Sequence, residues 1–277
     1  MRDYDFYIVP TPIGNLGDIT ARAIEVLKSV DIIACEDCRN TQKLLNHFSI
    51  RTRCISYHKF NEKERVRQFI SLIKEGKKIA LVSDAGTPLF CDPGAIIVKE
   101  LQKENIRITA LPGANAAVTF LSQIPRATED FIFIGFLPKS KKQTYELLTK
   151  HKNENTLFYD SPNRLLDTLY VIKDINPDAI VSVGRELTKL YEEVLTDNIT
   201  NIISNFTNRE IKGEIVVMIH AFDTDNTAEM YIDKINKLKE KKFSDKDISI
   251  ILSILFDLNK NDVYDCLLNK KGHKKLN

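Results

Sequence analysis

The segment Ile79–Pro88, which reads IALVSDAGTP, carries the clearest indication of the fold. Its first four residues, Ile79–Val82, form a continuous apolar run of the kind found in strands that are buried on both faces. The residues that follow, Ser83–Pro88, are small or are turn formers, and such a loop lets the backbone approach a ligand closely. The segment therefore predicts a buried strand that ends in a ligand-binding loop.

The same alternation extends through the first half of the chain. Further strand-like runs are Tyr7–Val9, Ile32–Cys35 and Ile106–Leu111. Amphipathic stretches that predict helices lie between the strands: Thr20–Ser29, Thr41–Phe48, Glu62–Glu75 and Pro93–Glu104. Apolar strands separated by helices predict a mostly parallel sheet covered on both faces. Ligands of such sheets bind in the loops at the carboxyl ends of the strands.

A second α/β series begins near Phe131. Its strand-like runs are Phe131–Gly135, Thr156–Asp160, Ala179–Gly184, Glu192–Thr196 and Glu214–Ile219, and its predicted helices are Lys142–Lys150, Pro162–Ile175 and Ile199–Phe206. From about Thr224 onward the strand pattern is absent and short helices are predicted, followed by a basic tail, Lys270–Lys275. We therefore expect an α/β protein with an N-terminal domain (1–123), a second α/β domain (124–222) and a helical extension (223–277).

Composition excludes several classes of protein. Of the 277 residues, 43% are hydrophobic and 28% are charged, which is enough to bury a core and is not typical of a disordered chain. The net charge of +2 gives no overall basic field, so an RNA-binding surface has to be a local patch. Apolar runs such as Ile248–Phe256 are far shorter than the roughly 20 residues that span a bilayer. With no signal-peptide pattern at the start, we expect a cytoplasmic protein that does not enter a membrane.

Two further loops resemble Ser83–Pro88 in composition. Pro10–Thr20, PTPIGNLGDIT, follows the first strand and is neither a dinucleotide fingerprint nor a phosphate-binding P-loop. Leu111–Ala117, LPGANAA, places a Pro-Gly turn at a helix N-terminus, where free N–H groups suit an anionic or polar ligand. A tight turn without function explains each loop singly, but three at one sheet edge predict a ligand crevice. By contrast, Asp92-Pro93 reads as a helix cap followed by proline at the first helical position.

Charged side chains follow the second strand. The segment Cys35–Thr41, CEDCRNT, brings two carboxylates and an arginine next to a buried strand, either as a helix cap by Asp37 or Asn40 or as the rim of an active site. His58, which follows another strand-like run, is either structural or catalytic. Gly184–Lys189 concentrates charge after a strand of the second half and reads as a surface ion pair or as part of a site.

The Cys35-x-x-Cys38 pair raises the question of a metal or redox site. A zinc ion takes about four ligands, and the remaining candidates (His47, Cys54, His58 and Cys91) are irregularly spaced. We therefore expect no metal site.

Taken together and in this order, these loops resemble the tetrapyrrole methylase superfamily, and within it the members that methylate small-subunit ribosomal RNA. The resemblance covers most of the first 220 residues. The stretches that carry it are Val9–Thr20, Glu36–Arg39, Leu81–Pro88, Leu111–Gly113, Phe158–Leu165, Gly184–Lys189 and Lys212–Glu214.

The resemblance implies S-adenosylmethionine-dependent 2′-O-methylation of a cytidine ribose in the decoding region of small-subunit (16S) ribosomal RNA. It implies that the cofactor lies in the cleft between the two α/β domains. The implied cofactor-binding residues are Pro12, Gly14, Asp84, Ala85, Gly86, Thr87, Pro112, Gly113, Ala114, Tyr159, Leu187 and Gly213. The implied partners are ribosomal RNA or the assembled small subunit, and a second copy of the chain in a homodimer.

The candidate catalytic residues are Glu36, Asp37, Arg39 and His58. A sulfonium donor carries an already activated methyl group, so alignment, at about 7–11 kcal/mol, outweighs a base that contributes about 10²–10⁴-fold. Glu36, Asp37 and His58 are the candidates for that base, and Arg39 is suited to hold a phosphate. The candidate RNA contacts are Arg39, Lys43, Lys59, Arg164, Arg185 and Lys189, with Arg65, Arg67 and the terminal lysines as further basic groups.

Four positions depart from the family pattern: Cys38 replaces the usual Thr, Cys91 the usual Ser, Phe60 a second His, and Asn115 a common Ser. The Cys replacements preserve size, so we expect folding and cofactor binding to survive, whereas Phe60 leaves His58 as the one histidine of that motif. Two alternatives stay open. The protein could be a sister methylase acting on a tetrapyrrole precursor, or a non-catalytic RNA-binding factor of ribosome assembly.

Overall fold

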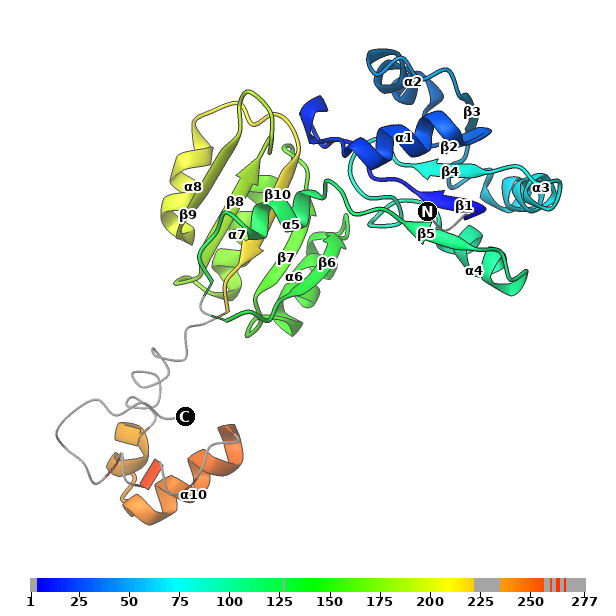
Figure 1. The fold of residues 1–277 in the computed structure, drawn as a ribbon. Coiled ribbons are helices and arrows are strands. Elements are labelled where there is room, and N and C mark those ends of the chain that lie inside the picture. Colours follow the sequence, from blue (N-terminus) through cyan, green and yellow to red (C-terminus); the bar gives the residue numbers. More distant parts are fainter. Residues whose placement is uncertain are drawn as a thin grey trace. The chain divides into compact units, whose positions relative to one another are not determined.

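The computed structural model describes residues 4–126, 128–221 and 235–256, together with residues 260, 263, 264 and 267. The chain separates into two compact units, Met1–His220 and Ala221–Asn277. The first unit contains two five-stranded sheets, each with helices on its faces (Figure 1). The predicted fold class, two α/β parts followed by a helical extension, is confirmed, whereas the boundaries predicted at 123/124 and 222/223 stay predictions.

The first sheet is parallel throughout, in the order β3-β2-β4-β1-β5. Its strands are β1 (Phe6–Ile8), β2 (Ile32–Cys35), β3 (Arg53–Ser56), β4 (Ile79–Val82) and β5 (Ile108–Ala110). Strand β4 is buried along its whole length and pairs with β2 and β1, as expected for the apolar run that predicted it. The loops after β2, β4, β1 and β5 therefore emerge at one sheet edge.

Helices cover both faces of the first sheet. Helices α1 (Ala21–Ser29) and α2 (Cys38–His47) pack on the face that carries Ile33 and Ala80. Helices α3 (Glu62–Lys74) and α4 (Ala95–Lys103) pack on the opposite face, which carries Ile79 and Leu81, and they lie side by side. This arrangement buries every residue of β2 and β4 and leaves the carboxyl-terminal loops as the place for polar chemistry.

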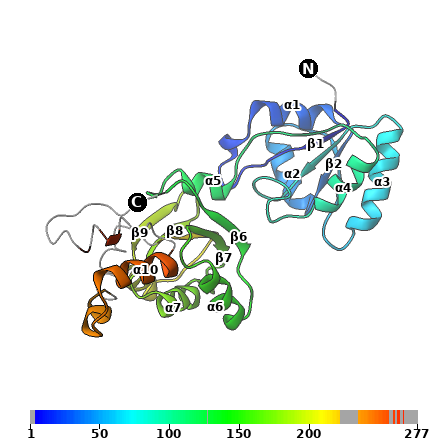
Figure 2. The same cartoon turned by 90° about the horizontal axis from the view of Figure 1, so that it is seen from below.

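The second sheet is mixed, in the order β6-β7-β10-β8-β9, with only the β6–β7 pair parallel. Its strands are β6 (Ile132–Phe136), β7 (Thr156–Asp160), β8 (Ile180–Arg185), β9 (Glu193–Asn198) and β10 (Ile215–Ile219). The helices α6 (Lys141–Lys150), α7 (Leu165–Ile175) and α8 (Ile199–Thr207) cover one face, and Figure 2 shows α6 beside α7 there.

The short helix α5 (Ala116–Leu121) packs on the other face of the second sheet. Its Phe120 is fully buried, and Gly184 in β8 makes room for that ring, since a Cβ there would lie 2.5 Å from Phe120 Cδ2. Ile13, from the loop after β1, belongs to the same apolar cluster. The loop after β1 and the start of α5, whose sequences predicted a crevice, are thereby packed against the second sheet.

Two helix starts differ from the sequence expectation. Helix α2 begins at Cys38, three residues earlier than predicted, because Asp37 caps it through the N–H of Arg39. The predicted cap at Asp92-Pro93 is wrong: α4 begins at Ala95, and its N-cap is Gly94, with φ +140°. The turn is made by Leu89, Cys91 and Gly94, which all have positive φ, so Asp92 is left in a loop.

In the second unit, the described residues include a helical segment at 235–240 and α10 (Asp245–Phe256). Ile248 and Leu252 of α10 pack with Val263 and Leu267 in a small core of their own. The predicted basic tail Lys270–Lys275 lies outside the described residues. Within the described chain, every helix is too short or too polar to traverse a lipid bilayer.

Candidate active site

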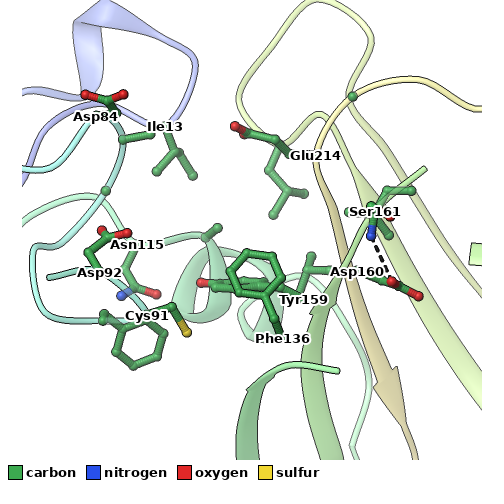
Figure 3. Close-up of a pocket in the computed structure, with 18 of the residues that line it drawn as sticks. Ile13, Asp84, Cys91, Asp92, Asn115, Phe136, Tyr159, Asp160, Ser161 and Glu214 are labelled. Atoms are coloured by element: carbon green, nitrogen blue, oxygen red, sulfur yellow. Dashed lines mark hydrogen bonds between the residues drawn. The ribbon is translucent and has the colours of Figure 1, made fainter. Parts of the chain in front are cut away.

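Loops from both sheets of the first unit line a cavity of about 400 Å³ (Figure 3). The first sheet contributes the loop after β4, and the second contributes the ends of β6, β7 and β10. The lining residues are Ile13, Asp84, Ala85, Gly86, Thr87, Phe90, Cys91, Asp92, Asn115, Ala116, Phe136, Tyr159, Asp160, Ser161, Pro162, Leu187, Gly213, Glu214, Ile215 and Val216. This volume falls in the usual range for a small-molecule or cofactor site.

Backbone and hydroxyl hydrogen bonds tie together the loops of the first sheet. Thr11 and Gly86 exchange two backbone hydrogen bonds of 2.9 Å, and the Thr11 hydroxyl donates to the Ser83 carbonyl over 3.0 Å. The Thr87 hydroxyl donates to the carbonyl of Ala114 over 3.0 Å. Gly86 adopts φ +78°, a conformation that disfavours residues with a Cβ. The three loops that sequence composition singled out are thus one hydrogen-bonded structure.

At the start of α5, where the sequence predicted free N–H groups for an anionic or polar ligand, two of these groups are bonded within the chain. Asn115 is the N-cap, and its Oδ1 accepts hydrogen bonds from the N–H groups of Ala117 (3.0 Å) and Val118 (3.2 Å). These N–H groups are therefore satisfied within the chain. At this end of α5, Asn115 and the small residue Ala116 line the cavity.

Aromatic rings form one wall of the cavity. Phe90 stacks on Phe133 with centroids 4.5 Å apart, and Phe133 meets Tyr159 edge-on at 5.2 Å. Phe136 lies 5.3 Å from Tyr159 and remains 64% exposed. Burial raises the pKa of Tyr159 to about 12, so its phenol is neutral at physiological pH. An exposed ring beside a neutral phenol suits a flat or cationic ligand.

The charge of the cavity is negative. Asp84, Asp92, Asp160 and Glu214 contribute carboxyl groups, and none of the described lining residues is Lys, Arg or His. Burial, together with the negative charges of Glu36 and Asp84, raises the pKa of Asp92 to about 6. Sequence reasoning missed Asp92 because Asp-Pro is so common at helix starts. The sequence did indicate a loop here, because Asp92 lies among the turn formers Pro88, Pro93 and Gly94.

The predicted cofactor-binding residues divide into two groups. Those that line the cavity are Asp84, Ala85, Gly86, Thr87, Tyr159, Leu187 and Gly213, and those that do not are Pro12, Gly14, Pro112, Gly113 and Ala114. Gly113 lies where a Cβ would come within 2.6 Å of the Pro10 ring, and Gly14 lies against the side chain of Lys189. The second group therefore shapes the loops around the cavity, while the roles of all twelve residues remain predictions.

None of the four candidate catalytic residues, Glu36, Asp37, Arg39 and His58, lines the cavity. Glu36, at the end of β2, is exposed; partial burial and the charge of Asp84 raise its pKa, while His58 opposes that rise. The side chain of Asp37 accepts hydrogen bonds from Arg39 of 2.7 and 3.2 Å, which hold the pKa of Asp37 at about 2. A carboxylate with so low a pKa is a weak base.

His58 is held at the outer end of the same sheet edge. Its backbone N–H donates to Asn61 Oδ1 over 2.8 Å, and its Nε2 lies 3.3 Å from Asn61 Nδ2. Its Nδ1 is buried and has no hydrogen-bond partner. Phe60 beside it is 94% exposed, with ring centroids 6.1 Å apart. The loops after β4, β2 and β3 thus run outward from the cavity in the order Asp84, Glu36, His58.

The six candidate RNA contacts also divide. Arg39, Lys43 and Lys59 are exposed on the first sheet's edge. The other three are engaged within the fold. Arg164 donates to the carbonyls of Leu137 and Pro138, Arg185 pairs with Glu193 at 3.2 Å, and Lys189 pairs with Glu186 (2.7 Å) and Glu214 (3.2 Å). Arg39 also pairs with Asp37 at 2.7 Å, but its side chain, like those of Lys43 and Lys59, is exposed, so these three are better placed for phosphate.

The Cys35-x-x-Cys38 pair is in contact, with Sγ atoms 3.2 Å apart, and both cysteines are free thiols. Burial raises the pKa of Cys38 to about 11, which keeps its thiol protonated. Among the residues that the structure describes, no group of three or more His, Cys, Asp or Glu side chains is arranged to hold a metal ion.

The two five-stranded sheets and the cavity lined by their loops are the features of one class of protein. Comparison with known families shows which class this is. The family model for Tetrapyrrole (Corrin/Porphyrin) Methylases matches residues 5–203, and the chain belongs to this family of methyltransferases. The fold is also that of diphthine synthase (TM-score 0.61, 13% identity, covering 78% of this chain and 89% of that one) and of cobalt precorrin-4 methyltransferase CbiF (TM-score 0.57, 17% identity, covering 77% and 93%).

Among individual proteins, this chain is similar to "Ribosomal RNA small subunit methyltransferase I" from several bacteria. It is 40% identical to the protein of Buchnera aphidicola subsp. Acyrthosiphon pisum over 273 residues, which cover 96% of each chain. It is 43% identical to that of Bacillus subtilis over 225 residues, covering 80% of this chain and 77% of the relative. The first of these similarities includes the C-terminal unit.

Proposed function

We propose that the protein transfers a methyl group from S-adenosylmethionine to the 2′-hydroxyl of a cytidine ribose in the decoding region of small-subunit ribosomal RNA. The observation that carries this proposal is the cavity itself, which combines carboxyl groups and aromatic rings with no basic side chain among its described lining residues. Such a lining favours a cationic ligand over a phosphorylated one. The name of the relatives supports small-subunit ribosomal RNA as the substrate.

The residues present fit the proposed donor. Small residues at Ala85, Gly86 and Ala116 leave space beside the backbone, and Leu187 and Phe136 offer apolar surface to an adenosine ring. The carboxyl group of Asp84 suits the positive charge of the sulfonium. When bound, a sulfonium supplies a methyl group that needs no further activation. The protein then has to align that methyl group with the acceptor, exclude water and remove the acceptor's proton.

We assign the acceptor side to the edge of the first sheet next to the cavity. Glu36, Asp37, Arg39 and His58 would orient the ribose and its flanking phosphates, with Arg39 suited to a bidentate phosphate contact. Arg39, Lys43 and Lys59 would bind the RNA backbone, and the 2′-hydroxyl would distinguish RNA from DNA. Arg164, Arg185 and Lys189 would instead hold the loops of the second sheet through the contacts described above.

Three further expectations complete the proposal. The acceptor would be ribosomal RNA or the assembled small subunit, the protein would act as a homodimer, and it would work in the cytoplasm, where bacterial ribosomes are assembled. The division into domains 1–123, 124–222 and 223–277 is proposed on the sequence pattern.

The test maps ribose methylation in small-subunit RNA from cells with and without the gene. We expect one 2′-O-methylated cytidine of the decoding region to disappear without the protein and to return with it. Purified protein, given labelled S-adenosylmethionine, is then offered naked RNA, the assembled subunit and a porphyrinoid. Methyl incorporation into the porphyrinoid alone would identify the sister-methylase alternative. A calorimetric titration without S-adenosylmethionine binding would identify a non-catalytic assembly factor.

A further inference from the structure

The sequence pattern predicted Asp92 to be a helix cap, but the structure places it elsewhere. It lies in the loop between β4 and α4 and lines the cavity. In Figure 3 it lies with Asp84 on the side of the first sheet, across from Tyr159 and Phe136 of the second. Because Gly94 is the N-cap of α4, the Asp92 carboxyl group does not cap that helix.

The backbone around Asp92 is strained. Leu89 has φ +71° and Cys91 φ +72°, both in the left-handed region that disfavours side chains. Strain of this kind persists only where the surrounding structure imposes it, most often at functional sites. Gly94 adds a third positive φ, and a Cβ there would lie 2.8 Å from Leu89 Cγ. In this turned conformation of the loop, Asp92 lines the cavity.

The other carboxyl groups of the cavity have different partners. Asp84 accepts a hydrogen bond from the backbone N–H of Asp37. Asp160 accepts one from Ser161 and in Figure 3 points away from the first sheet. Glu214 is 69% exposed and pairs with Lys189. Asp92 is half-buried among lining residues that include no described basic side chain.

We propose that Asp92 is the general base of the methyl transfer, the group that accepts the proton of the acceptor hydroxyl; this rests on the function proposed above. As the hydroxyl oxygen forms its bond to the methyl carbon, its O–H bond breaks and the proton moves to a carboxylate oxygen of Asp92. The bond from the methyl carbon to sulfur breaks with its electron pair going to sulfur, which becomes a neutral thioether. Asp92 later releases the proton to water.

The electrostatic surroundings of Asp92 match this role. The groups that face it are Glu36 after β2, Asp84 after β4, its neighbour Cys91, and Tyr159 of β7. Burial and the two negative charges raise its pKa to about 6, while the Ser83 hydroxyl opposes that rise. A carboxyl group with this pKa is ionised at neutral pH and still holds a proton more strongly than an ordinary aspartate does.

The experiment measures single-turnover methyl transfer against pH, with donor at saturation, for the full-length protein and its Asp92→Asn and Asp84→Asn variants. We expect the wild-type rate to rise with pH, with its midpoint near pH 6, and to level off above about pH 7. Asp92→Asn should lose that rise, and its plateau should fall by about 10²–10⁴-fold. Asp84→Asn should keep the rise, shifted to lower pH because one negative charge beside Asp92 is gone.

Two measurements do not depend on turnover. NMR titration of isotope-labelled aspartate should show one carboxyl with a pKa near 6 that is absent in Asp92→Asn. Calorimetry should show that Asp92→Asn still binds S-adenosylmethionine, which excludes misfolding as the cause of its slow rate. Methyl transfer by Asp92→Asn at the wild-type rate would overturn the assignment. A pKa near 4 for Asp92 in the wild-type protein would also overturn it. A wild-type protein that binds the donor but methylates no ribosomal RNA would overturn the proposed function instead, and the NMR result would still stand.

Discussion

The backbone N–H of Asp37 donates a hydrogen bond of 3.2 Å to Oδ1 of Asp84, and this bond joins the loops that follow two neighbouring strands, β2 and β4. Asp84 lines the cavity, whereas Asp37 belongs to the group that we assign to the acceptor. One carboxyl group thus couples the proposed donor side to the proposed acceptor side.

Replacing Asp84 should separate its charge from its hydrogen bond. Asp84→Asn keeps an acceptor for the Asp37 N–H but removes the charge, so we expect S-adenosylmethionine to bind about fivefold more weakly, or about 1 kcal/mol. Binding of the neutral thioether product should change by less than about twofold, since it carries no sulfonium charge. Calorimetric titrations with both ligands check this. An equal loss for both ligands would show that the charge of Asp84 is not what the donor recognises.

Replacing Arg39 should weaken RNA binding in a salt-dependent way. Its side chain is 91% exposed, and Arg39→Ala should reduce the slope of log affinity against log salt by about 1 if it contacts one phosphate. Binding measured at several salt concentrations tests this. Arg51→Ala is the matched control, because Arg51 is exposed but precedes β3, at the opposite edge of the sheet. Equal slopes for both variants would remove Arg39 from the RNA-binding surface.

A buried polar pair anchors the loop after β3. The Tyr57 hydroxyl donates to Oε1 of Glu62, the first residue of α3, and both residues are buried. Tyr57→Phe leaves the Glu62 carboxyl without this donor, and we expect a loss of about 1.5–3 kcal/mol in the free energy of unfolding. Urea denaturation measures it, with Tyr145→Phe on the surface as the control. A loss no larger than that of the control would mean that Glu62 finds another donor.

Gly184 is required for the contact between β8 and α5. A Cβ there would lie 2.5 Å from Phe120 Cδ2 and 2.9 Å from Val216 Cγ1, so Gly184→Ala should destabilise the fold by about 1–3 kcal/mol through overpacking. Gly17→Ala, where the nearest atom is a side-chain oxygen at 3.2 Å, should cost much less. Urea denaturation of both variants measures the two losses in the free energy of unfolding. Donor affinity should also fall in Gly184→Ala, because Asn115 and Ala116 at the start of α5 line the cavity.

His220 should make stability depend on pH. Its Nε2 lies 2.7 Å from the Ser182 hydroxyl, and burial lowers its pKa below the ordinary 6.5. The unfolded chain therefore binds a proton more readily than the folded one, so this contribution to stability is complete above about pH 6.5 and is lost as the pH falls below it. Urea unfolding at roughly pH 8 and roughly pH 5.5 should show a smaller loss for His220→Gln than for the wild type. The control is His47→Gln on the surface, which should behave like the wild type.

Most of the framework could be predicted from local sequence patterns. The apolar run Ile79–Val82 fixed a strand that needs cover on both faces, and small residues after it predicted a loop beside a ligand. These features are local, because strand burial and turn formation depend on a few adjacent side chains. The family resemblance rested on the same loops, and seven of the residues that it implied for the cofactor do line the cavity.

Which groups face one another depends on how distant parts of the chain pack together. Asp92-Pro93 has the local pattern of a helix start, but Leu89 and Cys91 adopt positive φ, and the helix is capped at Gly94, which lies against the side chains of Leu89 and Leu81. The same holds for Arg185 and Lys189, whose charge suggested RNA while their partners Glu193 and Glu186 lie within the fold. A side chain's pKa and its availability to a ligand depend on neighbours distant in sequence, and a linear pattern does not encode those distances.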